Sequence, residues 1–222
     1  MKISHRFVVL AALFVTCLIT ANVIAVKLVT FGFVVVPAAI FVFPVSYIFG
    51  DVLTEVYGYA WARRVIWLGF GCNLIFVFFA WLGQIMPPAS FWNGQQSYVT
   101  ILGAAPRILL ASFAGYLAGE FVNSFIMSKL KVLTRGRWLW TRTISSTIAG
   151  EGLDTALFIT IAFFGTPSFM PVIIVYHWAA KVVVEVAATP LTYVVVGWLK
   201  KVESVDVYDY ATDFNPFSVK AK

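Results

Sequence analysis

The chain has 222 residues, of which 61% are apolar and only 12% are charged, and its mean hydropathy is +0.89. Soluble domains carry about 25% charged residues, so this composition excludes a soluble enzyme or binding module and indicates an integral membrane protein with one domain. The net charge of +6 does not indicate a nucleic-acid partner, because the cations lie in short segments between apolar runs, where the positive-inside rule explains them.

Six apolar runs are long enough to cross a lipid bilayer, whose hydrocarbon core of about 30 Å takes about 20 helical residues. The first run follows Lys2 and Arg6, and we interpret it as a retained helix because no small-x-small cleavage site follows it. We therefore expect an all-α integral membrane protein with six transmembrane helices, at residues 7–26, 34–57, 65–82, 107–127, 143–164 and 172–199.

The basic residues indicate how these helices are oriented. Lys27 and Arg107 fall in loops on one side, whereas eleven cations fall on the other, namely Lys2, Arg6, Arg63, Arg64, Lys129, Lys131, Arg135, Arg137, Arg142, Lys200 and Lys201. By the positive-inside rule both termini are cytoplasmic.

Residues 1–201 are then a six-helix transmembrane domain, and residues 202–222 are a short acidic cytoplasmic tail that we expect to be mobile. The uncharged, aromatic segment 83–106 should pack at the outer interface or form a partial lid. Cys17 and Cys72 lie inside apolar runs and match no metal or redox spacing. The sequence thus predicts neither a cofactor nor a metal site.

Ionisable residues inside the spans are the main functional signal, because charge inside a membrane is rare and usually functional. Six of the ten acidic residues lie in or at the helices, namely Asp51, Glu55, Glu120, Glu151, Asp154 and Glu185. A helical rise of about 1.5 Å per residue places the last four, with Lys181, in the middle third of the bilayer. Asp51 and Glu55 lie nearer the cytoplasmic face and are predicted to form a gate or inner wall.

Other polar residues extend this set into a predicted midplane cavity, several of them at i,i+4 spacing on one helix face. They are Asn22, Tyr116, Asn123 and His177. The six carboxylates face two cations, Lys181 and Arg107, so we expect a ligand rich in hydrogen-bond donors. Glu120, Glu151 and Asp154, with no local cation in the sequence, are the strongest signals.

Structural interpretations are open for several of these residues. Lys181 and Glu185 could form an ion pair within one helix. Asp51 and Glu55 could instead pair with the two adjacent arginines at 63 and 64. A packing role is open for His177, and an interfacial role for Trp61, Trp67, Trp138 and Trp140.

An intramembrane aspartyl protease is the enzyme class to consider, because Asp51 and Asp154 lie on different helices. Neither residue stands in a Gly-x-Gly-Asp setting, and the sequence has no HExxH, nucleophilic serine or Cys/His motif. We therefore predict that the protein is not an enzyme.

Four stretches read FPVSYIFGDVLTEVYGYAWARRVIW at 43–67, PRILLASFAGYLAGEFVNSFIMSKLK at 106–131, STIAGEGLDTALFITIAF at 146–163 and HWAAKVVVEVAATPLTYVV at 177–195. In order and spacing they resemble the queuosine precursor transporter family, also called the VUT or YhhQ family. The resemblance implies uptake of 7-cyano- or 7-aminomethyl-7-deazaguanine across the bacterial inner membrane, for the queuosine modification of tRNA. It also implies a fold like the substrate-binding components of energy-coupling-factor vitamin transporters. Its motif positions assign site roles to Asp51, Glu55, Arg63, Arg64, Arg107, Ser112, Glu120, Ser145, Asp154 and Lys181.

A guanine-like ligand suits such a cavity, because one carboxylate can accept hydrogen bonds from the ring N–H and the exocyclic amine. Aromatic side chains would stack on its plane. We expect the purine edge to be bound by Glu120, Glu151 or Asp154. Lys181 or Arg107 would bind the carbonyl oxygen, in a transporter that works by alternating access. The alternative is a binding subunit or carrier for another flat, donor-rich solute such as a vitamin or nucleobase. The sequence also leaves open whether the protein forms a homodimer.

Overall fold

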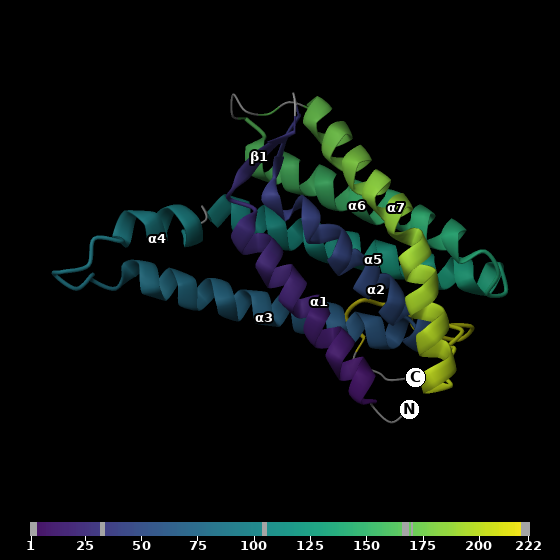
Figure 1. Ribbon diagram of the computed structural model, residues 1–222. Helices are drawn as coiled ribbons and strands as arrows, with labels where there is room; N and C mark the ends of the chain where they lie inside the picture. Colours follow the sequence, from purple (N-terminus) through teal and green to yellow (C-terminus); the bar gives the residue numbers. More distant parts are fainter. Residues whose placement is uncertain (1–3, 32–33, 104–105, 166–168, 170, 219–222) are drawn as a thin grey trace.

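Long helices make up most of the chain. The computed structural model describes residues 4–31, 34–103, 106–165, 169 and 171–218. Its elements are α1 (His5–Ile24), strands β1 (Leu28–Phe31) and β2 (Val34–Pro37), the 3-10 helix η1 (Ala38–Phe41), α2 (Phe43–Tyr57), α3 (Tyr59–Ile85), α4 (Gln95–Leu102), α5 (Pro106–Leu133), α6 (Leu139–Phe163) and α7 (Pro171–Glu203). Figure 1 shows the long helices crossing in one bundle, from which one end of α3 extends together with α4.

Long apolar helices are the main feature of the fold, as the sequence predicts. Among the described residues, five helical segments are long and apolar enough to cross a membrane, namely His5–Ile24, Ala38–Tyr57, Tyr59–Ile85, Gln95–Leu133 and Pro171–Glu203. The remaining long helix, α6, has 25 residues and carries Glu151 and Asp154 in its interior. A multi-pass helical protein follows, and the sixth crossing stays a prediction.

The predicted helix at 34–57 is wrong in its first part. β1 and β2 form an antiparallel hairpin in which Val29 pairs with Val36, and α2 begins only at Phe43. A run of valines is equally apolar in a strand and in a helix, and its branched side chains favour the strand. The fold is therefore not purely α-helical.

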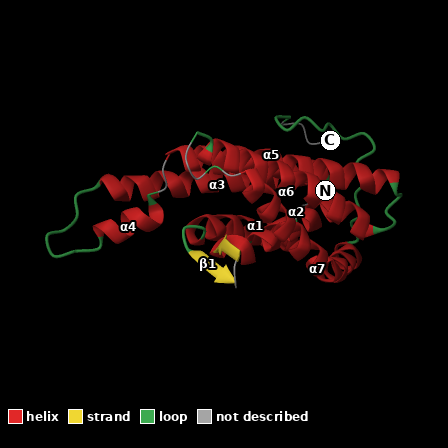
Figure 2. Ribbon diagram, turned by 90° about the horizontal axis from the view of Figure 1, so that it is seen from above, coloured by secondary structure: helices red, strands yellow, loops and turns green. Residues whose placement is uncertain are grey.

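The segment after α3 also differs from the expected loop. It contains α4, whose Tyr98 hydroxyl donates to the carbonyl of Ala80 at 3.0 Å and whose Gln95 amide donates to the carbonyl of Gln84 at 2.9 Å. Figure 2 shows α4 beside the far end of α3 and away from the other helices. The segment thus packs against α3.

Glycines bring α5 and α6 close together. A Cβ at Gly119 would lie 2.9 Å from the carbonyl oxygen of Gly150, and a Cβ at Gly115 would lie 2.5 Å from Oδ1 of Asp154. Small residues permit such close packing of helices in membranes. The two glycines of α5 therefore allow Asp154 of α6 to lie directly against the surface of α5.

The expectation that the C-terminal tail is mobile is wrong for residues 204–218, which pack on the ends of α3 and α5. Asp209 is only 5% exposed. Its Oδ2 accepts hydrogen bonds from the backbone N–H of Tyr59 at 3.0 Å and from the Ser128 hydroxyl at 2.5 Å. Arg63 donates to the carbonyl oxygens of Asp213 and Asn215. These acceptors satisfy buried donors at the start of α3 and on α5.

The two ends of the chain lie at the same end of the bundle, as Figure 1 shows. Arg6 at the start of α1 forms an ion pair with Glu203 at the end of α7, with Nη1 and Oε1 3.1 Å apart. This arrangement suits an even number of membrane crossings. The assignment of this end to the cytoplasm stays a prediction.

Candidate functional site

A cavity of about 140 Å³ lies between α1, η1, α2, α5, α6 and α7. Apolar side chains form most of its wall, including Leu18, Ile40, Phe43, Phe158 and Ile159. Its polar residues come from four helices and are Asn22, Ser112, Tyr116, Asp154, Thr155, His177 and Lys181. An apolar pocket with a few converging polar groups is the usual form of a small-molecule site.

Lys181 connects two carboxylates at one wall of the cavity. Its Nζ lies 2.5 Å from Oε2 of Glu151 and 2.9 Å from Oδ2 of Asp154. The side chain of Asp154 is 11% exposed and that of Glu151 only 2%. The expectation that these carboxylates have no local cation is therefore wrong, and so is an ion pair between Lys181 and Glu185. The wall keeps an excess of one negative charge when both carboxylates are ionised.

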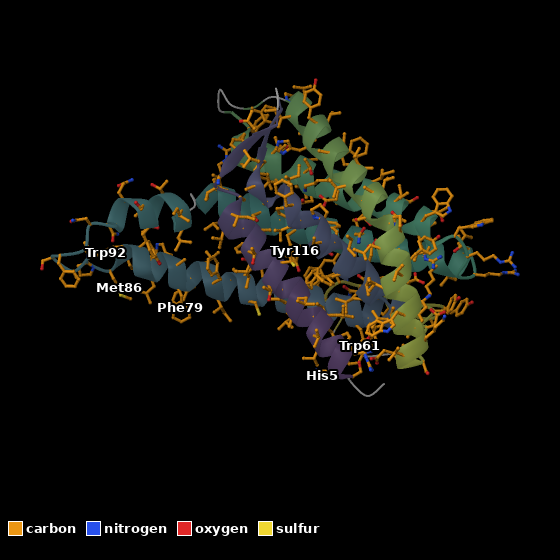
Figure 3. All side chains as sticks on the ribbon, viewed as in Figure 1. His5, Trp61, Phe79, Met86, Trp92 and Tyr116 are labelled. Atoms are coloured by element: carbon orange, nitrogen blue, oxygen red, sulfur yellow. The ribbon has the colours of Figure 1, made fainter. Side chains whose placement is uncertain are left out.

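Aromatic rings border this ion pair. The Lys181 ammonium lies 4.9 Å from the centre of the Phe43 ring, and Phe158 lines the same cavity. Tyr116, which Figure 3 shows in the middle of the bundle, donates from its hydroxyl to the carbonyl of Ile66 at 2.9 Å. Its ring orientation is thereby fixed by α3. The cavity thus offers flat apolar surfaces beside a charged edge.

A hydrogen bond joins two further polar residues across the cavity wall. The Ser112 hydroxyl of α5 donates to Oδ1 of Asn22 on α1 at 3.2 Å. Asn22, Ser112, Tyr116, Asp154, His177 and Lys181 are thus predicted site residues that line one space.

Two of the predicted site residues lie elsewhere. Arg107 donates from Nε and Nη2 to the carbonyl oxygens of Ile161 and Phe164, both at 2.5 Å, and so caps the end of α6. Ser145 lies on the exposed face of α6. Neither lines the cavity.

The other predicted residues lie in the protein interior beyond the cavity wall. Glu120 and Glu185 are each only 1% exposed. Asp51 is fully buried and accepts a hydrogen bond from Nδ2 of Asn123 at 2.7 Å. Asp51 also interacts electrostatically with Glu120 and Glu185. Glu120 and Glu185 each interact with Glu151 as well.

Glu55 lies in a separate group of charges, which we call the Glu55 network. Arg142 binds both Glu55 carboxylate oxygens, at 2.7 and 2.8 Å, and Lys200 binds Oε1 at 2.5 Å. Lys131 binds the Glu55 backbone carbonyl and, at 2.6 Å, Oδ1 of Asp206. The suggested pairing of Glu55 with Arg63 or Arg64 is wrong, because Arg63 binds the tail and Arg64 stacks on Trp61.

Four residues of the cavity and the Glu55 network are not among the site residues that the sequence predicts. Thr155 and Phe158 follow Asp154 on one helix, and the i,i+4 spacing from Asp154 was the signal that could have identified Phe158. Phe43 stands next to the helix-starting Pro44. Arg142 was counted only as a loop cation, because a single sequence contains no sign of its partner.

Comparisons with known proteins agree with the resemblance carried by the four stretches. A family model described as "Putative vitamin uptake transporter" matches residues 37–195. The "Probable queuosine precursor transporter" of Bacillus subtilis is 34% identical over 116 residues, covering 52% of this chain and 51% of the relative. The protein of that name from Haemophilus influenzae is 28% identical over 138 residues, covering 62% and 54%.

The "Queuosine precursor transporter" of Escherichia coli is 26% identical over 146 residues, covering 65% of this chain and 62% of the relative. The chain therefore spans between half and two thirds of the length of the curated relatives it matches. No solved structure matches it.

Proposed function

This chain belongs to the "Putative vitamin uptake transporter" family, and we propose that it imports queuosine precursors, 7-cyano- or 7-aminomethyl-7-deazaguanine, across the bacterial inner membrane. The names of three relatives support this substrate class. Membership of a transporter family also agrees with a protein that is not an enzyme.

The observation that carries the proposal is the Asp154 carboxylate at the wall of an otherwise largely apolar cavity. Its Oδ2 is held by Lys181 at 2.9 Å. A guanine-like edge presents a ring N–H beside an exocyclic amine, and a carboxylate can accept both hydrogen bonds. Asp154 is therefore the residue that would bind the purine edge, with Glu151 holding Lys181 from the buried side.

The rest of the ligand would meet complementary groups. Lys181 or His177 would donate to the carbonyl oxygen, and Phe43 or Phe158 would stack on the deazapurine plane. A volume of about 140 Å³ lies below the roughly 300–1,000 Å³ of pockets for drug-sized ligands. The size therefore suits a compact bicyclic base.

Transport would follow by alternating access around this cavity. The Glu55 network joins α2, α5, α6 and α7 through its buried ion pairs. Opening on the cytoplasmic side would require these pairs to separate or move together. Glu55 would thus act at the inner gate, with Asp51 one helical turn away.

Binding to the purified full chain tests this function. We expect 7-cyano-7-deazaguanine to raise the melting temperature and to give a calorimetric binding signal, with guanine weaker and biotin without effect. Asp154→Asn removes one charged acceptor, worth about 1.5–3 kcal/mol, so binding should weaken roughly 10- to 100-fold. Thr160→Val, on the exposed face of the same helix, is the matched control.

Lys181→Met should also weaken binding, because it removes the donor that holds Asp154. Wild-type affinity in both Asp154→Asn and Lys181→Met would contradict the assigned site. Binding of biotin in place of the deazaguanine would favour the alternative, a carrier of another flat, donor-rich solute.

A further inference from the structure

Three carboxyl groups outside the cavity are buried without the partners that buried charges require. They are Asp51 of α2, Glu120 of α5 and Glu185 of α7, which we call the acid cluster, and each is at most 1% exposed. Five of their six carboxyl oxygens accept no hydrogen bond from any residue that the structure describes. The sixth, Oδ1 of Asp51, accepts from Asn123 at 2.7 Å.

Three ionised carboxylates are not stable in this environment. An unpaired charge in a low-dielectric interior costs several kcal/mol or more, and these groups lie close enough to repel one another. The nearby cations are already engaged, Lys181 by Glu151 and Asp154 and Arg142 by Glu55. Bound protons are the simplest means of making the acid cluster neutral.

The titratable groups that face the acid cluster from α2, α5, α6 and α7 are mostly acidic or hydroxylic. Around Glu120 they are Asp51, Glu151, Asp154, Tyr47 and Tyr116. Around Asp51 they are Glu185, Glu55 and Arg142, and around Glu185 the group is Glu151. A proton bound here would therefore be attracted by several neighbouring acids.

The acid cluster lies between the ligand cavity and the Glu55 network. Glu120 is one helical turn from Tyr116, and Glu185 is one turn from Lys181, both of which line the cavity. Asp51 is one helical turn from Glu55 on α2, and so lies next to the Glu55 network. Residues four apart lie on one helix face, so carboxyl groups occur at successive levels from the cavity to the network.

Hydroxyl groups lie along the same region. The buried Tyr47 hydroxyl has no partner among the described residues and interacts with Glu120, Glu151 and Asp154. Between the levels of Asp51 and Glu55, the Thr54 hydroxyl lies 3.1 Å from the Ser124 hydroxyl. Chains of titratable side chains, carboxyl groups among them, are the proton relays of pumps and transporters, and hydroxyl groups beside them can accept and donate hydrogen bonds.

We propose that the acid cluster is the proton-binding site of a proton-coupled import cycle. The idea rests on the proposed function, since the cavity next to the cluster must bind the ligand. One proton enters from the outer solution by way of the cavity and binds at Glu120, Asp51 or Glu185. It leaves through Asp51 and Glu55 when the Glu55 network opens to the cytoplasm. With a neutral ligand, each cycle moves one positive charge inward.

A proton is favoured over a metal ion by the geometry of the acids. Among the described residues, no three His, Cys, Asp or Glu side chains converge as metal ligands. The carboxyl groups instead lie at successive levels, which suits transfer of a proton from one to the next. A sodium-driven cycle is the competing outcome of the test below.

The test uses the full chain in proteoliposomes, with labelled 7-cyano-7-deazaguanine outside and a pH-sensitive dye inside. An inward gradient of about one pH unit should support about tenfold accumulation at zero membrane potential, because one unit corresponds to a tenfold ratio. The dye should report acidification of the lumen only when the ligand is present. A protonophore should abolish the accumulation.

The variants Glu120→Gln, Glu185→Gln and Asp51→Asn isolate the acid cluster. In each, we compare gradient-driven accumulation with ligand exchange at equal pH in the same preparation, so that loss of folding or of binding is separated from loss of coupling. The accumulation ratio, which is the ligand concentration inside divided by that outside under the pH gradient, should fall toward one in at least one variant. Glu203→Gln, the same change at the end of α7, is the control and should keep the ratio of the wild type.

Two results would overturn the proposal. One is wild-type ligand exchange without proton flux, or with accumulation driven by sodium, which removes the proton cycle and leaves the transport function intact. The other is a wild-type accumulation ratio in all three variants. If the wild-type protein neither binds nor exchanges the ligand, the proposed function falls together with the coupling.

Discussion

Glu55 shows how a buried charge can be held in a membrane protein at the scale of single residues. Its carboxylate is fully buried, yet Arg142 binds it with two hydrogen bonds and Lys200 with a third. A bidentate arginine is the geometry that best compensates a desolvated carboxylate. The charge is thus structural as well as part of the proposed gate.

Removing Glu55 should destabilise the protein strongly. In Glu55→Ala the guanidinium of Arg142, only 1% exposed, would lose its carboxylate, and an unpaired buried charge costs about 3–5 kcal/mol. Thermal unfolding of the purified protein in detergent measures the loss. Lys200→Met is the control, because it leaves Arg142 on Glu55 and its side chain is 21% exposed, and its effect should be much smaller. Equal losses in the two variants would contradict this role of Arg142.

The sequence predicted which residues are charged inside the membrane, and it did not predict how they pair. Lys181 and Glu185 have the spacing of an ion pair within a helix, yet Lys181 reaches across to α6. Arg142 has the appearance of a loop cation, yet it is buried against α2. Pairing between helices depends on their rotation and separation, which the apolar pattern of one chain does not specify.

At the scale of elements, the approach of α5 and α6 sets the position of the candidate site. Gly115 and Gly119 leave room for Asp154 and for the backbone of Gly150. Without these glycines, Asp154 would move away from α5 and the cavity wall would change shape.

Gly115→Ala should therefore weaken ligand binding. The new methyl group would meet Oδ1 of Asp154 at 2.5 Å and its carbonyl oxygen at 2.9 Å, and overpacking of this kind costs about 1–3 kcal/mol. Calorimetry with 7-cyano-7-deazaguanine and the melting temperature measure the two effects. Gly197→Ala on α7 is the matched control, because its Cβ would meet nothing within 4 Å, and a shift of the same size there would contradict the explanation.

The hairpin and the C-terminal segment were the elements that the sequence did not predict. The valines of β2 continue without a break into the apolar residues of η1 and α2, so a hydropathy pattern joins them into one helix. The tail has the composition of a solvated segment. Its docking depends on a few specific contacts of Asp206 and Asp209 rather than on apolar periodicity.

Docking of the tail should depend on pH through Asp206. Burial alone would raise the pKa of Asp206, but hydrogen bonds and attraction from Lys131 and Lys200 lower it below its usual value. A lowered folded-state pKa stabilises docking fully above the unfolded value of about 3.9, and this contribution is lost as the pH falls through the folded value. The protection of residues 205–218 against hydrogen exchange, relative to the intrinsic exchange rate at each pH, should therefore stay constant near neutral pH and fall only in acid.

Asp206→Asn tests the assignment, because it should lower the protection of the tail at neutral pH and flatten its acid dependence. Tyr210→Ala, at an exposed position of the same segment, should leave both unchanged. An acid transition of normal size in Asp206→Asn would assign the pH dependence to another group.

At the scale of the whole molecule, the two ends of the bundle differ in charge, because the ion pairs of the Glu55 network and the tail lie at one of them. The termini, the Glu55 network and the docked tail share one end, and the turn between α3 and α4 lies far from it (Figure 1). Basic residues on the inner side of the membrane are the general rule. We therefore expect the end with the termini to face the cytoplasm.

Cysteine labelling in whole cells tests this orientation. After replacement of Cys17 and Cys72, a cysteine at Asn93 should react with an impermeant maleimide added outside. A cysteine at Ser218 should react only after the cells are opened. The reverse pattern would invert the topology and with it the direction of the proposed proton path.

The docked tail also imposes an order on biogenesis. A chain is made and inserted from its N-terminus, whereas Tyr59, Ser128 and Lys131 receive Asp209 and Asp206 from residues synthesised about 75 to 150 positions later. These donors of α3 and α5 therefore stay without their acceptors until the tail itself has been made and docked. A protein that ends after Glu203 would keep every helix but would leave Tyr59, Ser128 and Lys131 without the acceptors of the tail.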